Sequence, residues 1–113
     1  MVSTKEAAKA VVSALDSKKG SDIHVIDISA ISTLADYFVI CTGTSNTHIN
    51  TLCDAVEVAM EQIGDAMVSR EGHRSGTWVL LDYGGVVVHV FTDETRKFYD
   101  LERLWSDGAE VTL

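Results

Sequence analysis

The stretch Thr42-Gly43-Thr44-Ser45 has the residue types that bind phosphate, because small and hydroxyl-bearing residues stand between an apolar run and a helical pattern. Such a turn presents backbone N–H groups at the positive end of a helix dipole, beside two hydroxyls. The same groups occur at any capped helix, and this turn has neither a Walker lysine nor the three-glycine spacing of a dinucleotide fingerprint. Helix capping is therefore the favoured interpretation, and phosphate binding is the alternative.

Nucleotidyltransferases also place a Gly-Ser turn before a helix, but their catalysis needs two close carboxylates on a following strand to hold divalent ions. Asp54 and Glu57 face different sides of the helix that follows the turn, and Glu71 is alone at the end of the next predicted strand. Asp27 and Asp82 belong to separate strands. The residues therefore predict no catalytic activity and no cofactor, and no spacing of His, Cys and Asp resembles a metal site.

His89 shares one face of an apolar strand with Val87 and Phe91. A hydrogen-bonded core histidine is favoured there over a functional one. The two cysteines, Cys41 and Cys53, are too far apart for a CxxC redox pair and fit no zinc framework. We expect both to be buried thiols in a reducing cytoplasm.

Hydrophobic periodicity predicts the elements that position these residues. A capping box at Ser3–Glu6 starts the first helix, and Tyr83-Gly84-Gly85 forms a tight hairpin. The expected elements are a helix over 3–19, strands over 23–28 and 37–42, a helix from 44 to 63, strands over 66–71, 77–82 and 86–91, and a helix from 92. The order αββαβββα predicts a single α/β domain with a mixed β-sheet of about five strands flanked by helices.

The last helix has two sides when its residues are placed about 100° apart. One side carries Phe98, Leu101 and Trp105, and the other carries Arg96, Tyr99 and Arg103. A tyrosine between two arginines is typical of a contact surface. The alternative is a solvated face on which acidic neighbours pair with the arginines.

The composition limits the class of partner. The chain has 113 residues, no proline and a formal net charge of −8, which fits one soluble domain over 1–113 without a linker. Nine basic against seventeen acidic residues argue against a general nucleic-acid binder and favour a basic protein surface. The N-terminal segment lacks the continuous apolar core of a signal peptide, so we expect a cytoplasmic protein without a membrane segment.

Three segments together resemble the ribosomal silencing factor family, also called the Iojap-like proteins. They are ADYFVICTGTSNTH, then EG followed by GTWVLLDYGGVVVHVF, and RKFYDLERLW, within a resemblance that covers about residues 3–105. The resemblance implies a nucleotidyltransferase-like α/β fold without transferase activity. It also implies binding to large-subunit ribosomal protein fourteen, which sterically prevents the large ribosomal subunit from joining the small one and so represses translation.

The chain departs from the family pattern in the hairpin, where many members have Gly-Asp and this chain has Gly84-Gly85. If that carboxylate contacts the basic partner, binding is weaker here; if it only shapes the turn, glycine serves as well. Residues 106–113 lie beyond the resemblance and are expected to be a flexible tail.

Physical reasoning about strand and helix faces selects five candidate partner-binding residues: Trp78, Asp82, His89, Arg96 and Tyr99. Two other classes of function remain open. An active metal-dependent nucleotidyltransferase predicts carboxylates converging near Gly43. A self-associating scaffold, or a homodimer, predicts an apolar patch buried between identical chains, with Trp78 or Trp105 as the place to look.

Overall fold

The computed structural model describes residues 3–30, 33, 35–72, 77–98 and 109–111. Three helices and six strands follow one another along this part of the chain. They are α1 (Thr4–Ser17), β1 (Ser21–Asp27), β2 (Tyr37–Gly43), α2 (Asn46–Gln62), β3 (Ser69–Gly72), β4 (Trp78–Asp82), β5 (Val86–Thr92), α3 (Asp93–Phe98) and β6 (Ala109–Val111).

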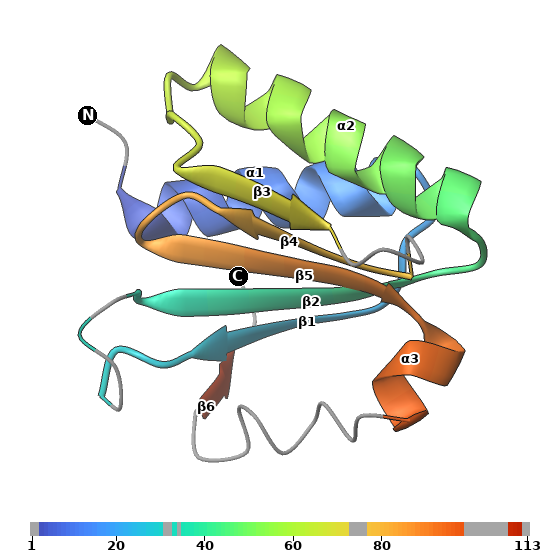
Figure 1. Cartoon of the computed structure of the whole chain (residues 1–113). Helices are drawn as coiled ribbons and strands as arrows, with labels where there is room; N and C mark the ends of the chain where they lie inside the picture. The colour runs from blue at the N-terminus through green and yellow to red at the C-terminus, as the bar shows by residue number, and fades with distance from the viewer. Residues whose placement is uncertain (1–2, 31–32, 34, 73–76, 99–108, 112–113) are drawn as a thin grey trace.

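All six strands form one sheet in the order β3-β4-β5-β2-β1-β6. Only β2 and β5 run parallel, with Val39 opposite Val88 and Cys41 opposite Val90; the other neighbours are antiparallel. The parallel pair requires a crossover, and α2 together with β3 and β4 provides it. Helices α1 and α2 lie side by side on one face of the sheet, and α3 stands at the end where β2 and β5 finish (Figure 1).

The main core lies between the sheet and the pair α1 and α2. Alternate residues of the central strands point into it, including Val39, Val88 and Leu81, each fully buried. Leu15 and Val56 enter the same core from α1 and α2. The apolar stripes of the two helices thus explain why they cover this face of the sheet.

The predicted caps are present at both long helices. The Ser3 hydroxyl accepts a hydrogen bond from the Glu6 backbone N–H at 3.1 Å, and the Ser45 hydroxyl accepts one from the His48 N–H at 3.1 Å. These hydrogen bonds satisfy donors that the helix itself leaves open at its first turn. The α/β fold with a mixed sheet is confirmed, and so is the start of α2 at the hydroxyl-bearing turn.

One strand was not predicted. Ala109–Val111, within the segment expected to be a flexible tail, forms β6 and pairs antiparallel with Val25–Asp27 of β1. The sheet therefore has six strands instead of about five. The pairing is long-range, so no local pattern in the tail could indicate it.

The hairpin glycine that departs from the family pattern has a packing role. A Cβ atom at Gly85 would overlap the Thr4 Cγ2 methyl group of α1. The Gly85 carbonyl also accepts hydrogen bonds from the Asp36 and Tyr37 N–H groups at 2.8 and 3.1 Å. Glycine at this position therefore lets α1 approach the turn closely.

Candidate functional site

The face of the sheet opposite α1 and α2 carries an apolar and aromatic surface, here called the aromatic face and defined by Phe38, Trp78, Leu80, Val87 and His89. Cross-strand register places these side chains together, because Leu80 lies opposite His89 and Phe38 lies opposite Val87. Phe38, Trp78, Leu80 and Val87 are half-buried. Phe38, Trp78 and Val87 pack against a second, smaller buried cluster that includes Ile40 and Phe91.

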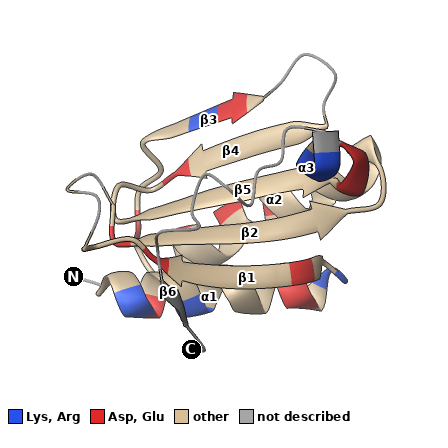
Figure 2. Cartoon of the chain, turned by 90° about the horizontal axis from the view of Figure 1, so that it is seen from below, with Lys and Arg blue, Asp and Glu red and all other residues tan. Residues whose placement is uncertain are grey.

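The strands β4, β5 and β2 of this face carry almost no charged residues, and the charges lie mainly at the strand ends and on the helices (Figure 2). A half-buried apolar surface without charges is typical of the centre of a protein interface. Phe38, Leu80 and Val87 of this face are not among the five candidates selected from the sequence. The alternation that they share with Trp78 and His89 was the signal that could have found them.

Trp78 and His89 are brought together on the aromatic face. The Trp78 Nε1–H group donates to His89 Nδ1 at 3.4 Å, and the Phe38 ring meets the His89 ring edge-on with centroids 5.2 Å apart. His89 is only 6% exposed, and burial lowers its pKa to about 4. The expectation of a hydrogen-bonded core histidine is confirmed, and its ring is neutral near pH 7.

Asp82 lies at the end of β4 and organises the hairpin. Its Oδ1 atom accepts a hydrogen bond from the Gly84 N–H at 2.8 Å, and Gly84 has a φ of +83° that favours glycine. Asp82 lies opposite Val87, so it is at the border of the aromatic face. The Asp82 carboxylate therefore stabilises the hairpin. That it also contacts a partner stays a prediction.

Arg96 is not on an exposed stripe, and that part of the sequence interpretation is wrong. Its side chain is 8% exposed, and its Nη1 atom donates to Thr42 Oγ1 at 3.0 Å and to the Asp22 carbonyl at 3.4 Å. Its guanidinium also lies 5.6 Å from the centroid of the Phe91 ring. The physical reason is that α3 packs on the ends of β2 and β5, where a long side chain can reach a strand hydroxyl.

The fifth candidate, Tyr99, lies outside the described residues, as do Leu101, Arg103 and Trp105. Within the described part of α3, the exposed cation is Lys97, which pairs with Asp93 at 2.9 Å. The structure therefore brings Trp78, Asp82 and His89 to one side of the sheet and places Arg96 in a buried position above Phe91.

The turn before α2 has its polar groups engaged within the protein. His48 Nδ1 accepts from the Thr44 N–H at 2.9 Å, and the Thr44 hydroxyl lies 3.2 Å from the same atom. Since Nδ1 is the acceptor, Nε2 carries the proton and donates to the Lys18 carbonyl at 2.8 Å. The favoured interpretation of the turn as a helix cap agrees with this geometry.

A hollow of about 840 Å³ adjoins this turn. Three carboxylates, those of Asp22, Asp93 and Glu94, line it beside Gly43. Sequence reasoning missed this convergence because Asp22 comes from the start of β1 and the other two come from α3. In the described part of the chain, no three or more His, Cys, Asp or Glu side chains are grouped so that they could hold a metal ion.

Both cysteines are buried thiols, as expected. Burial raises the pKa of Cys41 to about 12 and that of Cys53 to about 11, so neither is a reactive thiolate at neutral pH. None of the helices in the described part of the chain is long and apolar enough to cross a membrane.

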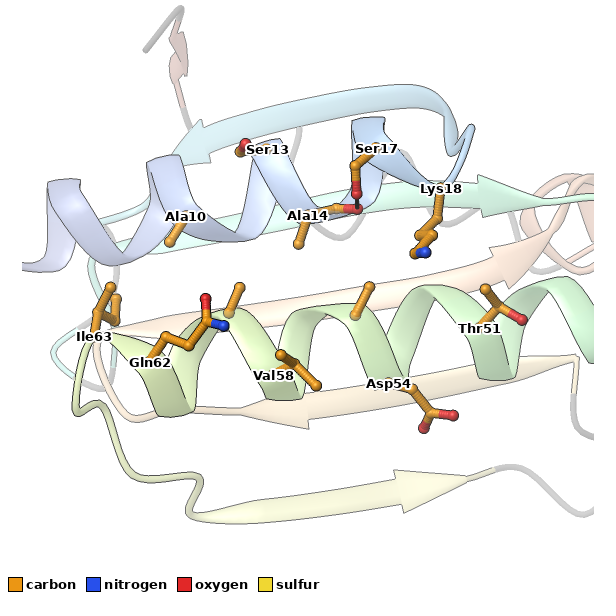
Figure 3. Close-up of a pocket in the computed structure, with 12 residues that line it drawn as sticks. Ala10, Ser13, Ala14, Ser17, Lys18, Thr51, Asp54, Val58, Gln62 and Ile63 are labelled. Atoms are coloured by element: carbon orange, nitrogen blue, oxygen red, sulfur yellow. Dashed lines mark hydrogen bonds between the residues drawn. The ribbon is translucent and has the colours of Figure 1, made fainter.

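On the opposite side of the sheet, a groove of about 680 Å³ runs between α1 and α2. Figure 3 shows Ala10, Ser13, Ala14 and Ser17 of α1 along one side of it and Thr51, Val58 and Gln62 of α2 along the other. Small side chains line most of the α1 side of this groove, and Val58 on the α2 side is 55% exposed.

The fold and these surfaces define a small α/β domain in which two helices cover one face of the sheet and the other face carries the half-buried aromatic face. The chain belongs to the family described as ribosomal silencing factor during starvation, which matches residues 2–113. This match confirms the resemblance found in the sequence and extends it over residues 106–113, which were expected to lie beyond it.

Relatives and a solved structure agree with this assignment. The ribosomal silencing factor of Chromobacterium violaceum is 41% identical over 101 residues, which cover 89% of this chain and 83% of that protein. A crystal structure of a Chromobacterium violaceum protein superposes with a TM-score of 0.88 at 39% identity, covering 93% of this chain and 88% of that one. The mouse protein called mitochondrial assembly of ribosomal large subunit protein 1 is 33% identical over 99 residues, 85% of this chain and 43% of that protein.

Proposed function

We propose that this protein is a cytoplasmic translational repressor that binds the large ribosomal subunit through large-subunit ribosomal protein fourteen and blocks association with the small subunit. The observation that carries the proposal is the aromatic face. It combines Trp78, half-buried aliphatic residues and a nearly uncharged centre on a domain that belongs to a ribosomal silencing family.

The electrostatics support a basic protein as the partner. The net charge of −8 attracts a basic surface and repels the phosphates of ribosomal RNA. The uncharged centre of the aromatic face would bury apolar side chains against the partner. Acidic residues around it would pair with basic residues at the rim of the interface. Binding should therefore weaken as salt rises, while retaining an apolar component.

We further propose that silencing occurs by steric occlusion and not by catalysis. The internal hydrogen bonds of Thr44 and His48 support a structural role for the turn at Gly43. Because carboxylates line the neighbouring hollow, nucleotide turnover needs a direct test. Incubation with nucleoside triphosphates and magnesium should give no product above blank, and turnover lost on Asp93→Asn would favour the transferase alternative.

The binding proposal is tested by adding the purified protein to isolated ribosomal protein fourteen, to large subunits and to joined ribosomes. We expect it to bind the first two and not the third. The matched control is Val58→Ala, which leaves the net charge unchanged. Val58 lies on the opposite side of the sheet from the aromatic face, so this variant should bind as the native protein does. Equal recovery with joined ribosomes would rule out occlusion.

A further inference from the structure

The aromatic face has a carboxylate at its β3 border. Glu71 lies opposite Leu80, and Leu80 lies opposite His89. Because residues directly opposite each other in antiparallel strands point to the same side of the sheet, the Glu71 side chain shares that side with the aromatic face. Its neighbour Arg70 points the other way and contacts Glu57 of α2 at 3.1 Å, as strand alternation requires.

Leu80 has two kinds of neighbours on this side of the sheet. Asp82 follows it by two residues on β4, which makes Asp82 and Glu71 diagonal neighbours with Cα atoms about 7–8 Å apart. Trp78 and His89 adjoin Leu80 in the other directions. Figure 2 shows acidic residues on β3 and at one end of β4, at the border of this face. One corner of the aromatic face is thus acidic, whereas the five residues that define the face carry no charge near pH 7.

The two carboxylates of this corner differ in their surroundings. Asp82 is half-buried, and its Oδ1 atom already accepts the Gly84 N–H at 2.8 Å. Glu71 is exposed, and its side chain makes no hydrogen bond or ion pair with the residues that the structure describes. Because β3 is an edge strand of the sheet, Glu71 stands at the rim of the face. Glu71 is therefore the carboxylate of this corner that is open to a cation of a partner.

A charge in this position affects the orientation of a partner. Apolar contacts at Leu80 are non-directional, so they alone allow several orientations. A carboxylate about one strand spacing, roughly 5 Å, from Leu80 favours the orientation that brings a cation to it. Rotating the partner by half a turn about Leu80 would instead place that cation over His89, which is neutral near pH 7.

We propose that Glu71 orients the basic partner on the aromatic face, by pairing with a lysine or arginine that lies beside the partner's apolar contact with Leu80. This inference rests on the proposed function, because it takes ribosomal protein fourteen as the partner. It adds a residue that determines orientation and specificity to a surface that binds mainly through apolar contacts. A partner with an acidic residue at that place would be repelled.

The test measures the affinity of the native protein and its variants for isolated ribosomal protein fourteen at several salt concentrations. Glu71→Gln should weaken binding about three- to fivefold and reduce its dependence on salt, and Glu71→Lys should weaken it at least about tenfold. The matched control is Glu61→Gln, the same change at an exposed position of α2 on the helical side, which should alter affinity less than about twofold. All three variants should melt with the native protein, because both side chains are exposed.

A charge exchange tests the direct pairing. Each exposed lysine and arginine of ribosomal protein fourteen is changed in turn to glutamate. One of these variants should bind Glu71→Lys at least about fivefold more tightly than it binds the native protein, because the two charges have been exchanged. If none of them does so, Glu71 does not pair with a cation of the partner and the inference is overturned.

The outcomes separate this inference from the proposed function. If the native protein binds and Leu80→Ala weakens that binding, while Glu71→Gln behaves as Glu61→Gln does, the aromatic face is the contact and Glu71 does not orient the partner. If the native protein does not bind ribosomal protein fourteen, the proposed function and this inference both fail.

Discussion

His89 shows how a single polar residue in an apolar strand links folding to pH. Its ring is 6% exposed and contacts two aromatic residues, and only the neutral form suits this environment. The sequence favoured a core histidine because the neighbouring alternate residues are apolar. The structure adds that the same ring supports Trp78 on the aromatic face.

The depressed pKa of His89 predicts a loss of stability in acid. The unfolded chain takes up a proton near pH 6.5, whereas the folded chain does so only near pH 4. The contribution of His89 to the free energy of unfolding is therefore complete above about pH 6.5. It falls by about 3 kcal/mol as the pH drops to 4. Denaturant unfolding of the native protein and of His89→Gln, which keeps an acceptor for Trp78, measures the difference. Parallel stability curves for the two proteins between pH 7 and 4 would contradict this account.

Arg96 marks the limit of helical periodicity at the residue scale. Periodicity alone does not tell which side of a short helix meets the sheet. The Thr42 hydroxyl that accepts the hydrogen bond from Arg96 is 54 residues away in sequence. No local pattern contains that contact, so the sequence does not indicate that Arg96 is buried.

At the scale of elements, His48 connects the start of α2 to the end of α1. One ring nitrogen accepts a hydrogen bond from the Thr44 N–H, in the turn before α2. The other donates to the Lys18 carbonyl, at the end of α1. Both groups stand at helix ends, where backbone hydrogen bonds are otherwise missing. The histidine thus links the strand-to-helix turn to the end of α1.

Replacing His48 by alanine should therefore destabilise the protein by about 1–2 kcal/mol, because two hydrogen bonds to backbone groups are lost. The change in denaturation midpoint measures this effect. Asn50→Ala, at an exposed position of the same helix, is the control and should stay within about 0.5 kcal/mol of the native protein. If both variants unfold alike, the connection is not stabilising.

The hairpin at Gly84-Gly85 gives a prediction about α1. Gly85→Ala should cost on the order of 1–3 kcal/mol, because its Cβ would overlap the Thr4 methyl group. Thr4→Ser removes that methyl and keeps the hydroxyl that donates to Asp36 Oδ2 at 2.9 Å. Thermal melts of the double variant should show most of the loss restored. An additive loss would mean that the overlap is not the cause.

Most elements could be predicted because their signals are local. Hydroxyl caps and apolar stripes predict the helices α1 and α2, and the glycine hairpin predicts the strands β4 and β5 on either side of it. Each of these signals spans only a few residues. Strand β6 and the pairing of β2 with β5 depend on contacts far apart in sequence. The same difference applies to the candidate site: Trp78 and His89 follow from strand alternation, whereas the partners of Phe38 follow only from the sheet order.

At the scale of the whole molecule, the sheet separates two surfaces of different chemistry. The helical side carries the groove between α1 and α2 and a smaller cleft lined by Glu57, Glu61, Asp65 and Tyr83. The other side carries the aromatic face with its uncharged centre. A repressor that acts by occlusion needs one such surface for its large-subunit contact and bulk behind it to exclude the small subunit.

The most direct test of this account is a subunit-joining experiment with sucrose gradients. Native protein and Val58→Ala should both keep large and small subunits apart when bound first to large subunits. Leu80→Ala, altered at the centre of the aromatic face, should remain folded and lose at least about fivefold in large-subunit affinity, and so allow joining at the same concentration. If Leu80→Ala prevents joining as well as the native protein, or if Val58→Ala is the variant that fails, the aromatic face is not the silencing surface.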